Sequence, residues 1–352
     1  MSATNLIDAH KLLYHPARVA EWQQRGDCYP IYVEIGLTNR CNHRCLFCAL
    51  DWLERGGVDI DREVLVRALA EMAACGVKSL MFAGEGESLL HRDAPLFIKT
   101  AHDHGIKVAV TTNGVPLTPE RAEACLPHLS WIRFSVNAGT AAEYARVHNT
   151  RGDDFERVLA NIRFAAEFKR RHGLKVDIGV QTLLLPEAMT GVCELAQRVK
   201  EAGADNFQVK PYSQHPASSN RFQLDYQRYL HLEPELKALA SAGFTVFFRR
   251  HTMERLAAGV DYSRCHGLPF FALINAHGQI IPCNLFYNDP EFVYGDLRRQ
   301  GFAEIWNGEQ RQGVLTAMRQ RDIKECRQAC RLDAINRYLE RVVSPEERDD
   351  FI

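Results

Sequence analysis

The chain has 352 residues, of which 46% are hydrophobic and 25% charged, so it suits one large globular domain with or without a smaller appendage. The formal net charge of -1 excludes wholesale binding to a polyanion such as nucleic acid. No apolar run is long enough to span a bilayer, and Asp8, His10 and Lys11 interrupt the apolar residues near the N-terminus. We therefore expect a cytoplasmic protein that binds neither nucleic acid nor membrane.

Short runs rich in β-branched and aromatic residues alternate with helical patterns over the first two thirds of the chain. The expected strands are 32–36, 79–83, 107–111, 131–136, 176–182 and 206–210. The expected helices include 61–75, 155–171 and 191–202. Such alternation predicts parallel strands with right-handed crossovers. Six β/α units in about 185 residues are fewer than the eight of a closed barrel, so we predict an α/β fold with a partial (β/α)6 barrel.

The pattern changes after about residue 235. Residues 271–282 contain two apolar runs around His277 and Gly278, which predicts a hairpin, and a helix-like stretch follows at 303–307. We expect a helical lead-in over 1–30, the barrel over 31–235, and a small second domain with a C-terminal helix over 236–352.

Several polar motifs follow the expected strands, at the C-terminal rim where a β/α barrel carries its active-site residues. RCNHRCLFC (40–48) follows the first strand, GEGES (84–88) the second, TTNG (111–114) the third, and SVNAG (135–139) the fourth. The loop KPYSQHP (210–216) follows the sixth. Each motif alone is weak evidence, but their coincidence with a cysteine cluster favours a functional rim.

The chain has eleven cysteines, and in a reducing compartment these indicate metal or redox chemistry rather than disulfides. Four are isolated: Cys75, Cys125 and Cys193 are expected to be ordinary buried residues, while Cys28, close in sequence to the first group, stays open. The other seven form three groups: Cys41, Cys45 and Cys48; Cys265 and Cys283; Cys326 and Cys330.

The first group supplies three ligands, one fewer than a tetrahedral metal site needs. Thiolates select zinc or iron-sulfur clusters. Zinc would need a fourth ligand such as His43 or Cys28. A [4Fe-4S] cube held by three cysteines instead leaves one iron open for a ligand from outside the protein.

The C-x3-C-x2-C motif after the first strand, with Phe47 before its third cysteine, resembles the signature of the radical S-adenosylmethionine superfamily. The resemblance implies that the open iron chelates S-adenosylmethionine. It also implies that an external one-electron donor, such as flavodoxin or ferredoxin, drives cleavage to a 5'-deoxyadenosyl radical that abstracts a hydrogen atom from substrate.

By the same resemblance, Gly86 and Glu87 match the Gly-Gly-Glu stretch that holds the amino group of S-adenosylmethionine. Glu85 interrupts the usual glycine pair, and Ser88 replaces a common proline. The remaining candidate contacts for this cofactor are Phe47, Asn113, Ser135, Asn137 and Gln181. For the polar ones, the alternative is that they satisfy nearby backbone groups.

The spacing Cys265-x12-Gly278-x4-Cys283, followed by GDL and EIWN, is similar to the start of SPASM and twitch domains. A full SPASM domain has seven cysteines and two auxiliary clusters. This chain offers four cysteines, namely Cys265, Cys283, Cys326 and Cys330. By the resemblance they imply one closed auxiliary [4Fe-4S] cluster.

A closed cluster suits electron transfer, and an alcohol that loses a hydrogen atom from its carbinol carbon must lose one more electron to become a ketone. We therefore predict oxidation of a secondary alcohol in a small polar substrate such as a sugar, aminocyclitol or nucleotide derivative, as in twitch-bearing aminocyclitol dehydrogenases. The candidate substrate contacts are Lys210, Tyr212, His215 and Arg221.

Three alternatives stay open. One is a redox-neutral sugar epimerase or dehydratase. Another is a maturase of ribosomal peptides, although only about thirty residues precede the first strand, too few for a leader-binding winged helix that a separate protein can supply. The last is an iron-sulfur electron carrier, against which the open iron argues.

Overall fold

A computed structural model describes residues 10–185, 191–222, 224–327 and 329–351. Its centre is one ten-stranded sheet in the order β10-β9-β8-β1-β2-β3-β4-β5-β6-β7. The strands are β1 (Tyr32–Ile35), β2 (Ser79–Phe82), β3 (Lys107–Thr112), β4 (Trp131–Ser135), β5 (Asp177–Leu183), β6 (Asn206–Lys210), β7 (Thr245–Phe248), β8 (Phe271–Ile274), β9 (Gln279–Ile281) and β10 (Gly295–Asp296). The six predicted strands are β1 to β6, and they pair in parallel in chain order. The predicted partial barrel is confirmed.

Two further strands extend the parallel sheet. β7 pairs with the outer edge of β6, and β8 pairs with the other edge of β1, from Tyr32 opposite Phe271 to Ile35 opposite Ile274. The predicted hairpin is β8 and β9, which are antiparallel. The hairpin of the second cysteine region therefore continues the barrel sheet. The boundary expected near residue 235 stays a prediction.

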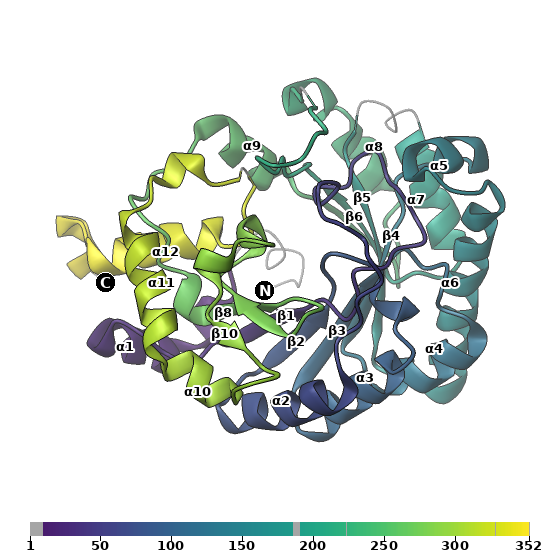
Figure 1. Cartoon of the computed structure of the whole chain (residues 1–352). Coiled ribbons are helices and arrows are strands. Elements are labelled where there is room, and N and C mark those ends of the chain that lie inside the picture. The colour runs from purple at the N-terminus through teal and green to yellow at the C-terminus, as the bar shows by residue number, and fades with distance from the viewer. Residues whose placement is uncertain (1–9, 186–190, 223, 328, 352) are drawn as a thin grey trace.

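The described residues form twelve α-helices, and those between consecutive strands of the barrel cover the outer, convex side of the curved sheet (Figure 1). The twelve helices are α1 (Pro16–Arg25), α2 (Arg62–Ala74), α3 (Ala94–Asp103), α4 (Pro119–Cys125), α5 (Ala141–His148), α6 (Asp153–His172), α7 (Val192–Glu201), α8 (Leu232–Ala238), α9 (Arg250–Ala258), α10 (Phe302–Asn307), α11 (Glu309–Gln320) and α12 (Asp333–Val343). None of the helices in the described ranges combines the length and the apolar composition needed to cross a bilayer.

Helix α2 shows how the local sequence sets these elements. The Asp61 carboxylate accepts a hydrogen bond from Val64 N at 3.0 Å and caps the helix. Leu65, Leu69 and Met72 face the core at helical spacing, and Gly76 follows the end with φ of 79°. This packing brings the carboxyl ends of the parallel strands to one edge, where the predicted rim motifs lie.

Candidate functional site

The first cysteine loop, residues 40–60, joins β1 to α2 and is closed at its base by side chains. Asn39 Oδ1 accepts a hydrogen bond from Val58 N at 2.8 Å, and Arg40 pairs with Asp59 at 2.6 Å. The base of the loop is thus fixed while its cysteines extend over the rim.

Gly86 in the loop after β2 touches this base directly. A Cβ at Gly86 would lie 2.3 Å from Thr38 O and 2.4 Å from Arg40 O, and Glu87 N donates to Arg40 O at 2.8 Å. Because both obstructing atoms are backbone, only glycine fits this close approach. The requirement explains this glycine of the GEGES motif.

The three cysteines of the loop are free thiols in a partly buried cluster. Burial raises the pKa of Cys41, and burial together with Cys41 and Cys48 raises that of Cys45. Three thiols gathered in one loop can share a metal, which would bind their deprotonated forms. The three sulfurs offer the donor chemistry of an iron-sulfur cube with one open iron.

Two side chains point hydrogen-bond donors at these sulfurs. Arg55 Nη2 lies 3.1 Å from Cys48 Sγ, and its Nη1 donates to His43 O at 2.9 Å. His148 Nδ1 lies 3.3 Å from Cys45 Sγ, while its Nε2 accepts from Asn137 N at 3.1 Å. Because Nε2 accepts, the ring proton belongs on Nδ1, and the imidazole donates to sulfur.

Sequence reasoning missed His148. It is 1% exposed, its ring stacks on Tyr144 with centroids 4.1 Å apart, and burial holds its pKa well below the usual range. The sequence shows only a histidine at the end of an amphipathic helix, and nothing local connects it to a cysteine 103 residues away. The alternative zinc ligand His43 instead faces Asp154 Oδ2 at 3.5 Å, and burial lowers its pKa.

Other groups of the protein already donate hydrogen bonds to the Glu87 carboxylate. It accepts hydrogen bonds from Thr112 Oγ1 at 2.8 Å, Asn113 N at 2.6 Å and Leu89 N at 3.1 Å. It is 4% exposed, and burial raises its pKa although these donors oppose the shift. Its contribution here is to fix the loops after β2 and β3 to each other.

The other predicted cofactor contacts lie along the same rim. Asn113 Nδ2 donates to Asn42 Oδ1 in the cysteine loop at 2.7 Å. Asn137 Oδ1 accepts from Leu183 N at 2.7 Å, so this oxygen satisfies backbone. Ser135 lies opposite Gln181 on adjacent strands. Phe47 packs edge-on against His148 at 5.2 Å and lines a large cavity.

Glu85, which interrupts the expected glycine pair, connects the rim to the hairpin. Its Oε1 accepts a hydrogen bond from Ala276 N, between β8 and β9, at 2.5 Å. It is 7% exposed, and burial raises its pKa to about 7. The departure from Gly-Gly-Glu therefore joins the barrel to the second cysteine region.

The second cysteine set gathers from three distant segments. Cys265, Cys283, Cys326 and Cys330 are free thiols, and burial raises the pKa of each while Cys330 adds to the effect on the other three. Asn336 Nδ2 lies 3.5 Å from Cys265 Sγ, and Leu332 N lies 3.4 Å from Cys330 Sγ. Four sulfurs with donors directed at them fit a closed cluster.

Cys28 lies apart from both sets. It is 5% exposed, its Sγ lies 3.7 Å from Pro269 O, and burial raises its pKa to about 12. It packs with Trp22 and Phe270 as a small apolar residue.

The four predicted substrate contacts lie at the end of β6 and in the loop after it, and only two of them line the large cavity. Lys210 and Tyr212 line the large cavity. The imidazole of His215 is instead used by backbone: Nδ1 accepts from Ala217 N, and Nε2 contacts Asn284 O, both at 3.1 Å. Arg221 is exposed and donates to backbone carbonyls of its own loop, including Pro216 O at 3.1 Å. The structure therefore does not bring His215 and Arg221 to the cavity.

The large cavity encloses about 1260 Å³ inside the barrel. Cys48 of the first set and Cys283, Cys326 and Cys330 of the second all line it. One molecule in this cavity can thus lie between the two sulfur clusters.

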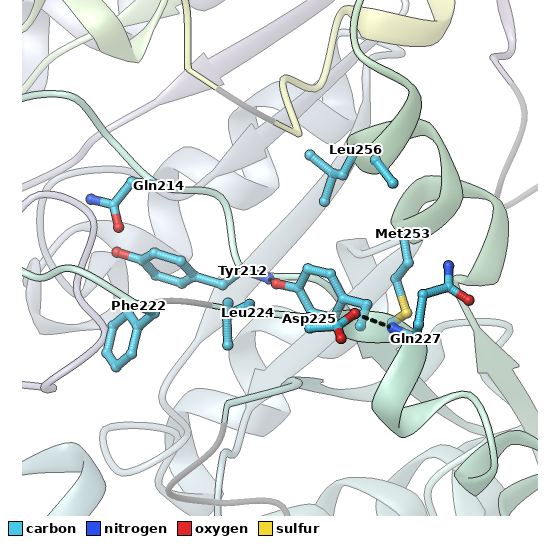
Figure 2. Close-up of a pocket in the computed structure, with 10 residues that line it drawn as sticks. Tyr212, Gln214, Phe222, Leu224, Asp225, Gln227, Met253 and Leu256 are labelled. Carbon is cyan, nitrogen blue, oxygen red and sulfur yellow. Dashed lines mark hydrogen bonds between the residues drawn. The ribbon is translucent and has the colours of Figure 1, made fainter.

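A smaller cavity of about 180 Å³ is lined by Tyr212 and Gln214 on one side of the view in Figure 2 and by Met253 and Leu256 of α9 on the other. It adjoins the large cavity, because Tyr212 and Leu256 line both. Since no cysteine lines it in the described ranges, we assign the chemistry to the large cavity.

Comparison with known proteins agrees with this geometry. A profile of the Radical SAM superfamily matches residues 35–189, and one of the SPASM iron-sulfur cluster-binding domain matches 265–331. An AdoMet-dependent heme synthase from Methanosarcina barkeri is 24% identical over 295 residues, which cover 77% of this chain and 80% of that protein.

Two solved structures share the fold. Streptococcus suis SuiB bound to the precursor peptide SuiA has a TM-score of 0.67 and 17% identity, covering 89% of this chain and 73% of its own. The structure of anSMEcpe with bound AdoMet has a TM-score of 0.57 and 16% identity, covering 87% and 88%. The first cysteine loop falls within one matched profile and the second cysteine set within the other, and the chain belongs to the radical SAM superfamily, with a C-terminal SPASM iron-sulfur domain.

Proposed function

We propose that this chain is a radical SAM oxidoreductase that oxidises a secondary alcohol of a small polar substrate held in the large cavity. The carrying observation is that cysteines of both sets line that one cavity. A substrate there can lose a hydrogen atom on the side of Cys48 and an electron on the side of Cys283.

Membership in the superfamily implies S-adenosylmethionine, a [4Fe-4S] cluster and auxiliary iron-sulfur ligation by the SPASM domain. Cys41, Cys45 and Cys48 would hold the first cluster, and the four cysteines of the second set would hold one auxiliary cluster. When bound, these groups supply a 5'-deoxyadenosyl radical and an electron acceptor, and a flavodoxin or ferredoxin supplies the first electron.

The balance of the reaction follows from the alcohol. The C–H bond of the carbinol carbon breaks, and its hydrogen atom becomes part of 5'-deoxyadenosine. Loss of the hydroxyl proton to solvent and of one electron, which a cluster held by the second cysteine set would accept, would leave a ketone.

A peptide substrate is the second candidate, and the shared fold with SuiB, whose structure includes a precursor peptide, supports it. Extracts from cells grown in deuterated medium separate the two. We would divide the extract into small-molecule and macromolecular fractions, add each to the reconstituted protein with dithionite and S-adenosylmethionine, and measure deuterium in 5'-deoxyadenosine by mass spectrometry.

We expect deuterium transfer from the small-molecule fraction, together with a product two hydrogens lighter than its precursor. Transfer only from the macromolecular fraction would favour peptide modification. Transfer without an oxidised product would favour epimerisation or elimination, and iron without any 5'-deoxyadenosine would favour an electron carrier.

Hydrogen bonds to the cluster sulfurs give a separate prediction. Arg55→Gln removes the charged donor to Cys48 Sγ, so we expect the reduction potential of the first cluster to fall by about 60 mV, or roughly 1.4 kcal/mol. Arg44→Gln is the matched control, because Arg44 in the same loop donates to Cys41 O at 2.7 Å rather than to sulfur. A redox titration followed by electron paramagnetic resonance measures both, and equal shifts would contradict a specific role for Arg55.

A further inference from the structure

Three cationic side chains from three strands enter the large cavity. Arg133 comes from β4, Lys210 from the end of β6, and Arg249 follows β7. The sequence named Lys210 as a candidate but did not group these three residues, because other strands and helices separate them along the chain. Parallel pairing of β4, β5, β6 and β7 brings them to one side of the barrel.

The hydrogen-bond partners that Arg133 and Lys210 find within the barrel wall are neutral. Arg133 Nη1 donates to Gln208 Oε1 at 3.1 Å, and Lys210 Nζ donates to Gln181 Oε1 at 3.1 Å. Arg133 Nε is buried without a hydrogen-bond partner in the described structure.

The carboxylates that line the cavity are mostly committed elsewhere. Glu34 pairs with Arg331 at 2.8 Å, and Asp333 pairs with Arg255 at 3.3 Å. Asp177 accepts from Asn206 Nδ2 at 2.7 Å, although its charge also stabilises Arg133. The wall around Arg133 and Lys210 therefore carries excess positive charge in a confined space.

The electrostatics of Lys210 agree with that excess. Burial lowers its pKa to about 7, with further lowering by Arg249, Arg133 and Arg331 and opposition only from Glu34. A bound anion would supply the missing negative charge and raise this pKa.

We infer that the substrate carries a phosphate or carboxylate group, and that Arg133 and Lys210 bind this anion inside the barrel. The inference rests on the proposed function for the identity of the site. It narrows the small polar substrate to an anionic one and places the reacting carbon nearer the rim, toward Cys48.

Calorimetric titration of the reconstituted protein, with saturating S-adenosylmethionine present, tests this. The probes are sulfate, which stands for a phosphate and keeps its charge from pH 6 to 9, and malonate, which stands for a carboxylate. Calorimetry is preferred to thermal melting because sulfate stabilises proteins without binding a site. Tighter binding of one probe distinguishes the two anion classes.

We expect Arg133→Gln to weaken the better probe at least about tenfold, as loss of a charge-assisted contact does. Arg151→Gln, an exposed arginine paired with Asp153 at 3.1 Å, should bind as the wild type does. Lys210→Met keeps the side-chain volume without a buried charge, and it should also weaken binding while remaining folded. The wild type should bind less tightly as the pH rises through about 7, and Lys210→Met should lose this dependence.

Unchanged affinity in both cavity variants would overturn the inference. So would displacement of the probe by S-adenosylmethionine, because the cations would then serve the cofactor carboxylate. Since the titration involves no turnover, a failed oxidation assay with intact, Arg133-dependent binding would count against the proposed reaction and not against the anion site.

Discussion

The Cys45→Ala variant is expected to lose the first cluster alone. The wild type, reconstituted under anaerobic conditions, should hold about eight irons per chain in two cubane clusters, and the variant about four. Formation of 5'-deoxyadenosine should fall at least about a thousandfold, because one-electron cleavage of S-adenosylmethionine requires the first cluster and its open iron. Iron analysis and mass spectrometry measure the two quantities.

Two companion variants make this result specific. Cys283→Ala should also drop to about four irons, yet it should still form 5'-deoxyadenosine, because its sulfur belongs to the second set. Cys75→Ala, at the end of α2 and outside both sets, should match the wild type. A Cys283→Ala protein that keeps its full iron content would show that this cysteine is not a ligand, and residual cleavage by Cys45→Ala would contradict the role of the first loop.

The local sequence was sufficient for the elements of the barrel. Each of the six strands is a short run whose side-chain pattern and flanking turns are visible without knowledge of the rest of the chain. Pairing between β1 and β8 was not predictable in this way, because it joins Tyr32 to Phe271 across most of the chain. The hairpin was found, but its place in the sheet required the tertiary structure.

The same distinction applies to the site. The cysteines can be recognised from their spacing in the sequence. Arg55 and His148 cannot, because their place in the site depends on distances of 3.1 Å to Cys48 Sγ and 3.3 Å to Cys45 Sγ that no motif encodes. Glu87 was assigned to the amino group of S-adenosylmethionine by resemblance, which stays a prediction, and the structure adds hydrogen bonds to its oxygens from Thr112, Asn113 and Leu89. Residue type thus indicates what a side chain can bind, while its neighbours decide what it does bind.

Gly86→Ala is expected to be as damaging as loss of a ligand, although Gly86 donates nothing to a cluster. The added Cβ would lie 2.3 Å from Thr38 O and 2.4 Å from Arg40 O, so the loop after β2 and the base of the cysteine loop must separate. Since neither obstacle is a flexible side chain, we expect the free energy of unfolding to fall by about 3 kcal/mol. Separation would also break the hydrogen bond from Glu87 N to Arg40 O and move the three cysteines.

Denaturant unfolding of the apoprotein and iron content after reconstitution measure these two effects separately. Gly56→Ala is the matched control: Gly56 lies in the same cysteine loop, and no atom comes within 4 Å of its added Cβ. Alanine there should be neutral or stabilise by about 0.5 kcal/mol through the unfolded state. If Gly86→Ala unfolded like the wild type and still held about eight irons, the close approach at Gly86 would not position the cysteine loop, and the glycine would have to serve the cofactor directly.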